Sequence, residues 1–62
     1  MIVVFLAFIY CTADGCQVES RRYEGNPYYC SMEAQYLAHE WIEANAPGAR
    51  LAKWGCRMGR PA

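Results

Sequence analysis

The first eleven residues constrain the fold most, because they form an unbroken apolar run. The run is rich in β-branched and aromatic side chains, namely Ile2, Val3, Val4, Phe5, Phe8, Ile9 and Tyr10. Apolar residues at every position, rather than at alternate ones, are typical of a strand buried on both faces. The run is also only about half of the ~20 residues that a helix needs to cross a bilayer. We therefore expect residues 1–11 to form the central strand of a sheet.

The same run resembles the apolar part of a secretory signal, with a small-x-small cleavage site that ends at Ala13. Against this interpretation, no Lys or Arg precedes the run, and the first basic residue is Arg21. Tyr10 is also unsuited to the position before a lipoprotein-type Cys11. We expect the segment to be a retained strand, which favours a cytoplasmic protein. Disulfides formed in the cell would instead indicate a periplasmic or secreted one, and the sequence leaves this open.

The polar stretch after the run predicts a hairpin. Asp14-Gly15 is a turn signal, because glycine adopts positive φ at no steric cost. Residues 16–23 are polar enough to form an edge strand, where charged side chains discourage pairing with other chains.

The next segment, residues 31–45, predicts a helix, since Ser31 is a good N-cap and no Gly or Pro follows before Pro47. Apolar residues at helical spacing predict the buried stripe, namely Ala34, Leu37, Ala38, Trp41 and Ala44, with Ile42 at its margin. Other residues fall on the opposite side, namely Met32, Tyr36, His39, Glu40 and Glu43. Pro47-Gly48 ends the helix, and residues 49–57 are the third expected strand.

This order predicts one α+β domain over residues 1–62, with a β-β-α-β chain path. The most apolar strand takes the centre, so the three-stranded sheet has the order 2-1-3, with the helix on one face after a right-handed crossover. A chain of this size buries only about 60% of the surface that its unfolded form exposes. Such a core usually needs disulfides, a metal or a partner subunit as well.

The four cysteines allow three pairings. The expected topology brings Cys11 to Cys16 across the hairpin, and Cys30 to Cys56 at the opposite end of the sheet. Two disulfides are therefore predicted. By loop-closure entropy the first would contribute about 2 kcal/mol to stability and the second about 3.5 kcal/mol.

The sequence supports metal-binding, redox and enzymatic functions less well than it supports two structural disulfides. A four-cysteine zinc site needs all four sulfurs around one ion, yet the pairs lie about 30 Å apart. The Cys-x₄-Cys spacing beside Asp14 lacks the cation that would stabilise a thiolate. The stretch from His39 to Glu43 resembles a zinc-protease helix but lacks its second histidine. We expect no cofactor, no metal and no enzymatic activity, and keep a thiol-redox or metal-binding protein as a second alternative function.

Six basic and six acidic residues cancel, so no bulk charge directs the chain towards nucleic acid. The cations gather near the C-terminus as Arg50, Lys53, Arg57 and Arg60, around Trp54. They are candidate contacts for an anionic partner, and a nucleic-acid-binding module is the first alternative function. If Cys56 faces the helix, strand alternation turns Trp54 and Ala52 inward and leaves the far face to Leu51, Lys53 and Arg57.

One helix covers one face of a three-stranded sheet, while the central strand is apolar on both. We therefore expect a small interaction or accessory protein that acts through its apolar sheet face, as a twofold homodimer or with another protein. The candidate interface residues are Val3, Phe5 and Leu51, with Met32 and Tyr36 on the outer helix face as a second patch.

Four stretches together carry a resemblance: "CTADGC", the helix "SMEAQYLAHEWIEA", the turn "APGA" and "KWGC". With them the chain resembles short bacterial four-cysteine proteins of uncharacterised function. The resemblance implies a single small domain of bacterial origin. It implies no activity, and it assigns no functional residues.

Overall fold

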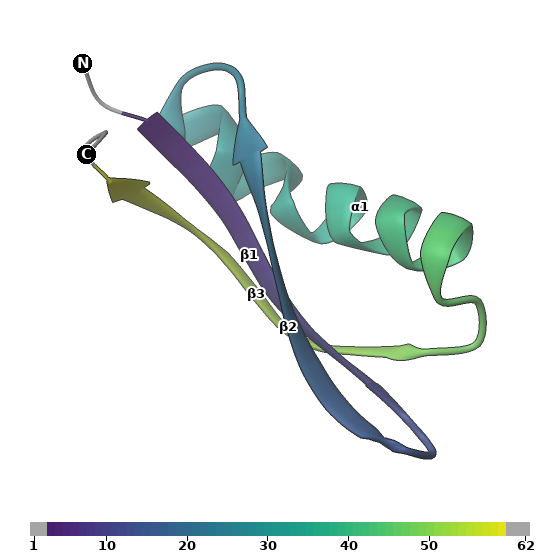
Figure 1. Ribbon diagram of the computed structural model, residues 1–62. Helices are drawn as coiled ribbons and strands as arrows, with labels where there is room; N and C mark the ends of the chain where they lie inside the picture. The colour runs from purple at the N-terminus through teal and green to yellow at the C-terminus, as the bar shows by residue number, and fades with distance from the viewer. Residues whose placement is uncertain (1–2, 60–62) are drawn as a thin grey trace.

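The computed structural model describes residues 3–59 (Figure 1). It has three strands and one helix in the order β1 (Val3–Thr12), β2 (Gly15–Tyr23), α1 (Pro27–Asn45) and β3 (Arg50–Gly59). The strands form one sheet in the order β2-β1-β3, and β1 is antiparallel to both neighbours. The predicted fold is confirmed, and β3 extends two residues beyond its predicted end.

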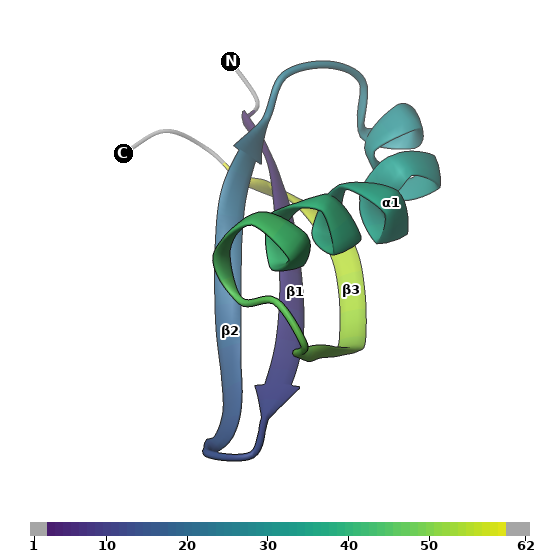
Figure 2. The same ribbon diagram turned by 90° about the vertical axis from the view of Figure 1, so that its right-hand side faces the viewer.

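The central strand β1 has two different faces. Its even positions Val4, Leu6 and Phe8 are buried, and Phe8 is only 1% exposed. They pack against Ala34, Ala38 and other buried residues of α1, which crosses this face of the sheet over β3 and β1 (Figure 2). The odd positions of β1, from Val3 to Cys11, are half-buried. The expectation of a strand buried on both faces is therefore met on the helix side only.

The helix begins four residues earlier than predicted. Asn26 is its N-cap, and the Asn26 Oδ1 accepts a hydrogen bond of 2.7 Å from the Tyr28 backbone N–H. Pro27 follows in the first helical turn, where its missing N–H leaves no hydrogen bond unmade. Ser31 therefore lies inside α1, because Asn26 and Pro27, which precede the predicted helix, supply its start.

The buried stripe of α1 also differs from the predicted one. The buried residues follow one another every four positions, as Cys30, Ala34, Ala38 and Ile42. Ile42 therefore lies in the stripe rather than at its margin, and the predicted Ala44 is exposed. Alanines at the middle of the stripe let the helix backbone approach the sheet closely.

Each end of the helix–sheet interface has its own anchor. At one end the disulfide Cys30–Cys56 joins α1 to β3. At the other end the ring of Trp41 packs against Phe8 and Tyr10, at centroid distances of 5.4 and 5.2 Å. The second disulfide, Cys11–Cys16, closes the β1–β2 hairpin. Both predicted disulfide pairings are confirmed.

A β-bulge in β3 changes which residues face the helix. Ile9 pairs with Lys53 but Tyr10 pairs with Leu51, so Ala52 is an extra residue in β3. Leu51 consequently packs against the core, and its predicted position on the far face is wrong. Ala52 is exposed rather than inward.

Trp54 pairs with Phe8 and shares its side of the sheet, as predicted, but β3 is an edge strand there. Its side chain is 42% exposed, so it is not a core residue. Within residues 3–59, no helix is both long and apolar enough to span a membrane.

Candidate interaction face

The side of the sheet away from α1, called here the open face, is defined by the strand register. Residues directly opposite one another in adjacent antiparallel strands point to the same side. The rows across β2, β1 and β3 on this side are Arg22–Phe5–Arg57, Ser20–Ala7–Gly55, Val18–Ile9–Lys53 and Cys16–Cys11–Arg50, with Val3 opposite Gly59 at the end. Aliphatic and aromatic side chains thus follow the centre of the open face.

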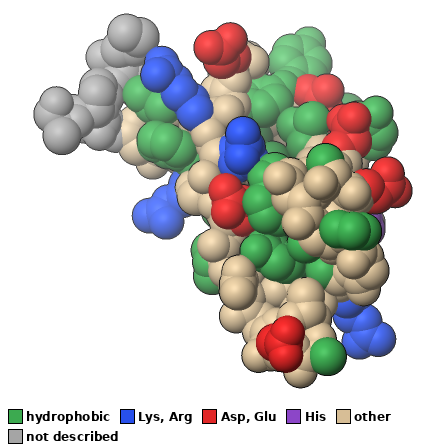
Figure 3. All heavy atoms as spheres, turned by 45° about the vertical axis from the view of Figure 1, so that its right-hand side comes forward, with side chains coloured by type: hydrophobic (Ala, Val, Ile, Leu, Met, Phe, Trp, Pro, Cys, Tyr) green, Lys and Arg blue, Asp and Glu red, His purple; other side chains and the backbone are tan. Residues whose placement is uncertain are grey.

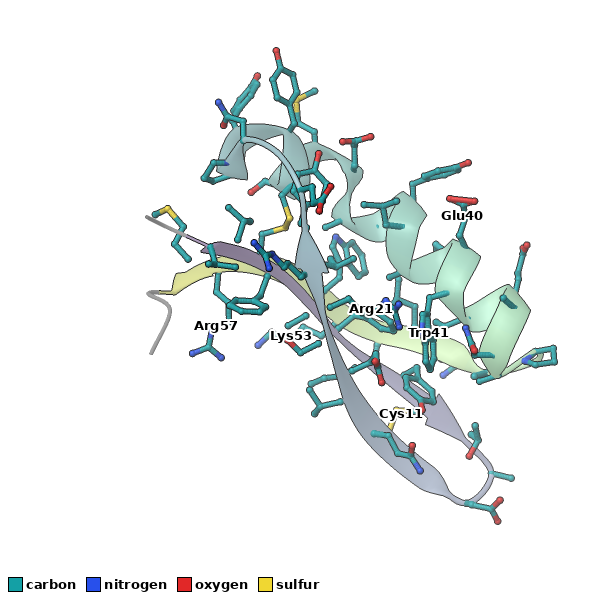
Figure 4. All side chains as sticks on the ribbon, turned by 45° about the horizontal axis from the view of Figure 1, so that its top comes forward. Cys11, Arg21, Glu40, Trp41, Lys53 and Arg57 are labelled. Carbon is teal, nitrogen blue, oxygen red and sulfur yellow. A yellow bond between two sulfur atoms is a disulfide. The ribbon has the colours of Figure 1, made fainter. Side chains whose placement is uncertain are left out.

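The open face is basic. Its rows carry the four cations Arg22, Arg50, Lys53 and Arg57, and none of the described residues in these rows is acidic. Glu24, just past β2, lines a pocket with Val3 and Arg22 at the end of the face. The acidic residues lie elsewhere: Asp14 in the hairpin turn, Glu19 on the helix side of β2, Glu24 before α1, and Glu33, Glu40 and Glu43 on α1. Acidic side chains gather over α1 in Figure 3. In Figure 4, Lys53 and Arg57 point away from α1, whereas Glu40 lies on its outer side.

A groove lies on the open face over the small residues Ala7 and Gly55. It has a volume of about 330 Å³, and its lining includes Ala7, Ile9, Val18, Lys53 and Arg57. Gly55 lies between the two cations on β3, and a Cβ added to it would meet no atom within 4 Å. The space above Gly55 is therefore open, with a cation on either side along the strand.

The predicted site residues divide between the faces. Val3 and Phe5 are on the open face, as are the three predicted cations Arg50, Lys53 and Arg57. Arg60 lies outside the described residues. The structure thus brings one apolar group and one basic group of predicted residues together on one surface.

The second predicted patch lies on the other side of the molecule. Met32 and Tyr36 are exposed on the outer face of α1, and Tyr36 is 63% exposed. Because α1 covers the helix side of the sheet, this patch is separate from the open face.

Sequence reasoning missed Arg22 and Val18, and Val18 is 69% exposed. The signal was present in the hairpin. A turn centred on Ala13-Asp14 pairs Cys11 with Cys16, and the same register places Val18 opposite Ile9 and Arg22 opposite Phe5. Both residues belong to the open face for this reason.

A second groove, of about 310 Å³, lies on the helix side between β2 and α1, and Leu6, Arg21, Leu37 and Trp41 contribute to its lining. Arg21 forms an ion pair with Glu19 at 3.8 Å. This groove therefore combines apolar side chains with a cation that already has a carboxylate partner.

Above the second groove, β2 and α1 are joined by a hydrogen bond. The Tyr23 hydroxyl donates to the Glu33 Oε2 at 2.5 Å. This hydrogen bond raises the pKa of Tyr23, and desolvation and the Glu33 charge act in the same direction. The contact fixes the start of α1 against the end of β2.

All four cysteines are in disulfides. His39 and Glu43 are exposed on α1, and no group of three or more metal-ligating side chains occurs among residues 3–59.

Comparison with protein-family models, with curated proteins and with solved structures finds no match to this chain.

Proposed function

We propose that the protein is a small disulfide-stabilised interaction module and that the open face is its docking surface. The observation that carries this proposal is the half-buried apolar row Val3–Phe5–Ala7–Ile9 in the centre of a sheet that α1 covers on the other side. Val18 extends the row onto an edge strand, where it is 69% exposed. Contiguous apolar surface with a polar rim is typical of a site that binds a partner.

The charges of the open face favour a different protein as partner over a second copy. In a twofold dimer packed sheet to sheet, the four cations of each copy would meet four like charges. The face is also small: three strands about 4.8 Å apart and about 33 Å long cover roughly 500 Å². A stable interface usually buries about 800 Å² on each partner. A partner that brings negative charge compensates for the small area.

Photo-crosslinking in the cells that produce the protein tests this proposal. A benzophenone side chain replaces Val18 on the open face or Tyr36 on the outer face of α1, which are exposed to similar extents, 69% and 63%. We expect a discrete adduct from position 18 that disappears when Lys53 and Arg57 are changed to Glu, and none from position 36. An adduct of two copies of this chain would identify the homodimer, and adducts only from position 36 would contradict the proposal.

Nucleic-acid binding is the second candidate, and it is favoured by one observation: the register adds Arg22 to the cations of β3 on a single face. Its test is fluorescence anisotropy with a mixed-sequence single-stranded oligonucleotide at several salt concentrations. For single strands, the logarithm of the affinity should fall with that of salt by about 0.7 for each phosphate neutralised. Absent or salt-independent binding removes this candidate.

A further inference from the structure

The groove on the open face has a charged half on β3. Lys53, Gly55 and Arg57 alternate with inward-facing residues, so all three are on the open face. The Cα atoms of Lys53 and Arg57 are about 13 Å apart, four residues along a strand. Both side chains are long enough to reach one group between them, and the bare Gly55 leaves that place empty.

Within residues 3–59, neither Lys53 nor Arg57 forms an ion pair with a carboxylate. The one ion pair within residues 3–59 joins Arg21 to Glu19, on the helix side of the sheet. None of the residues in the open-face rows is acidic, so none of them competes for Lys53 or Arg57. A ligand that supplies an anion here therefore gains two charge-assisted contacts without breaking an existing one.

The groove also has an apolar half, formed by Ala7 and Ile9 of β1 and Val18 of β2. Ala7 is directly opposite Gly55, so the apolar half begins one strand spacing, about 4.8 Å, from the charged half. A ligand that fills both halves needs an anionic group and an aliphatic group joined by a few bonds.

The apolar half favours a protein segment over a nucleic acid as the source of this ligand. Surfaces that bind single strands offer aromatic rings on which the bases stack. The open-face side chains of the apolar half are aliphatic, while Phe8 and Trp54, which also line the groove, belong by register to the helix side of the sheet. Phe5, the one aromatic residue in the open-face rows, lies instead against Gly59, where its ring would be 3.4 Å from an added Cβ. Aliphatic side chains of a partner fit this surface better than bases do.

We infer that the groove over Gly55 is a recognition site for a carboxylate joined to an aliphatic side chain, presented by an acidic segment of a partner protein. The inference rests on the proposed docking role of the open face and names the chemistry of its partner. Lys53 and Arg57 hold the carboxylate above Gly55, while Ala7, Ile9 and Val18 contact the aliphatic group.

Three small probes test the two halves separately, by titration of the ¹⁵N-labelled, disulfide-bonded protein in NMR spectroscopy. N-acetyl-leucine carries both groups, N-acetyl-leucinamide lacks the charge, and acetate lacks the aliphatic side chain. For N-acetyl-leucine we expect a dissociation constant of roughly 1–10 mM, the range for a ligand of this size. The backbone amides of Ala7 and Gly55 should shift, and each of the other two probes should bind at least about tenfold more weakly.

Variants of the groove provide the matched controls. Lys53→Gln with Arg57→Gln should weaken N-acetyl-leucine binding about tenfold or more, while Arg50→Gln, on the same face outside the groove lining, should leave it within twofold. Gly55→Val should fill the space above Gly55 and abolish binding. The spread of amide signals in the spectrum of each variant tests whether that variant is folded.

The outcomes distinguish this inference from the proposed function. Equal shifts from all three probes, or none at Gly55, overturn the carboxylate site. If position 18 still forms its crosslinked adduct in that case, the docking role stands. An oligonucleotide that shifts the same amides more strongly than N-acetyl-leucine, in a salt-dependent way, would identify a nucleic acid as the ligand and overturn the inference.

Discussion

The two faces of one strand, β1, show how the same kind of side chain serves two purposes. Phe8 faces α1 and is buried, while Phe5 faces the open side and is half-buried. Their own sequence context is equally apolar, so β1 alone does not separate them. Their cross-strand neighbours do: Phe8 lies between Glu19 and Trp54, whereas Phe5 lies between two arginines, Arg22 and Arg57. The flanking strands and the helix, rather than the central strand itself, distinguish the covered face of β1 from its open face.

The largest expected effect on stability comes from replacing each phenylalanine in turn. Phe8→Ala should lower the free energy of unfolding by about 3–5 kcal/mol, because it leaves a cavity between β1, Trp41 and the alanines of α1. Phe5→Ala should cost less than about 1.5 kcal/mol, since its ring is already partly in water. Urea unfolding with the disulfides intact measures both. Equal losses would show that the open face is covered in solution.

The two disulfides can be compared in the same way, by the stability that is lost when each is removed. Replacing Cys30 and Cys56 with Ala should cost about 3.5 kcal/mol, because their bond spans 26 residues and ties α1 to the sheet. The same change at Cys11 and Cys16, which span 5 residues of a hairpin already paired by strand hydrogen bonds, should cost about 2 kcal/mol or less. Thermal unfolding of the two double variants ranks them. The reverse ranking would mean that the hairpin, and not the helix, needs the covalent link.

A smaller effect on the free energy of unfolding is expected at the start of α1, on the covered side of the sheet. Asn26→Ala should lower the free energy of unfolding by about 1 kcal/mol, since it removes the side-chain acceptor of the Tyr28 N–H. Ser31→Ala is the matched control and should change it by less than about 0.5 kcal/mol, because Ser31 is an exposed residue inside α1. A larger loss from Ser31→Ala would place the helix start where the sequence alone suggested it.

The smallest effect concerns pH. The raised pKa of Tyr23 means that the folded protein holds this proton more tightly than the unfolded chain does. The resulting stability is fully present below about pH 10, the ordinary pKa of tyrosine, and is lost as the pH rises towards the folded pKa. Tyr23→Phe should therefore be less stable than the wild type at pH 8, by a difference that shrinks above pH 10.

The matched control for this pH effect is Tyr36→Phe, which removes an exposed hydroxyl from the outer face of α1. Urea unfolding between pH 8 and 11 gives the free energies for both variants. A Tyr23→Phe difference that stays constant over this range would contradict the role of the Tyr23–Glu33 hydrogen bond.

Much of the fold could be predicted because it depends on strong local signals. An apolar run fixes β1 in the centre, and the hairpin and the helix then bring the cysteines together in pairs. Two errors came from shifts of a few residues. The helix starts at Asn26-Pro27 rather than at Ser31, and the bulge at Ala52, which moves Leu51 to the helix side, has no sequence signal as strong as a turn.

The candidate site was predicted only in part, because it depends on register. Val3, Phe5, Lys53 and Arg57 were recognised from their residue types, but Arg22, Val18 and Gly55 become site residues only through their cross-strand neighbours. The groove itself depends on two small residues, Ala7 and Gly55, that are far apart in the sequence but opposite each other in the sheet.

The most direct test of the central claim, that the open face is the binding face, compares two grooves on opposite sides of the sheet in one NMR titration with N-acetyl-leucine. The grooves have similar volumes, about 330 and 310 Å³. We predict that amide shifts concentrate at Ala7, Ile9 and Gly55 on the open face. Shifts concentrated at Leu37 and Trp41, or no saturable shifts on the open face, would contradict the account.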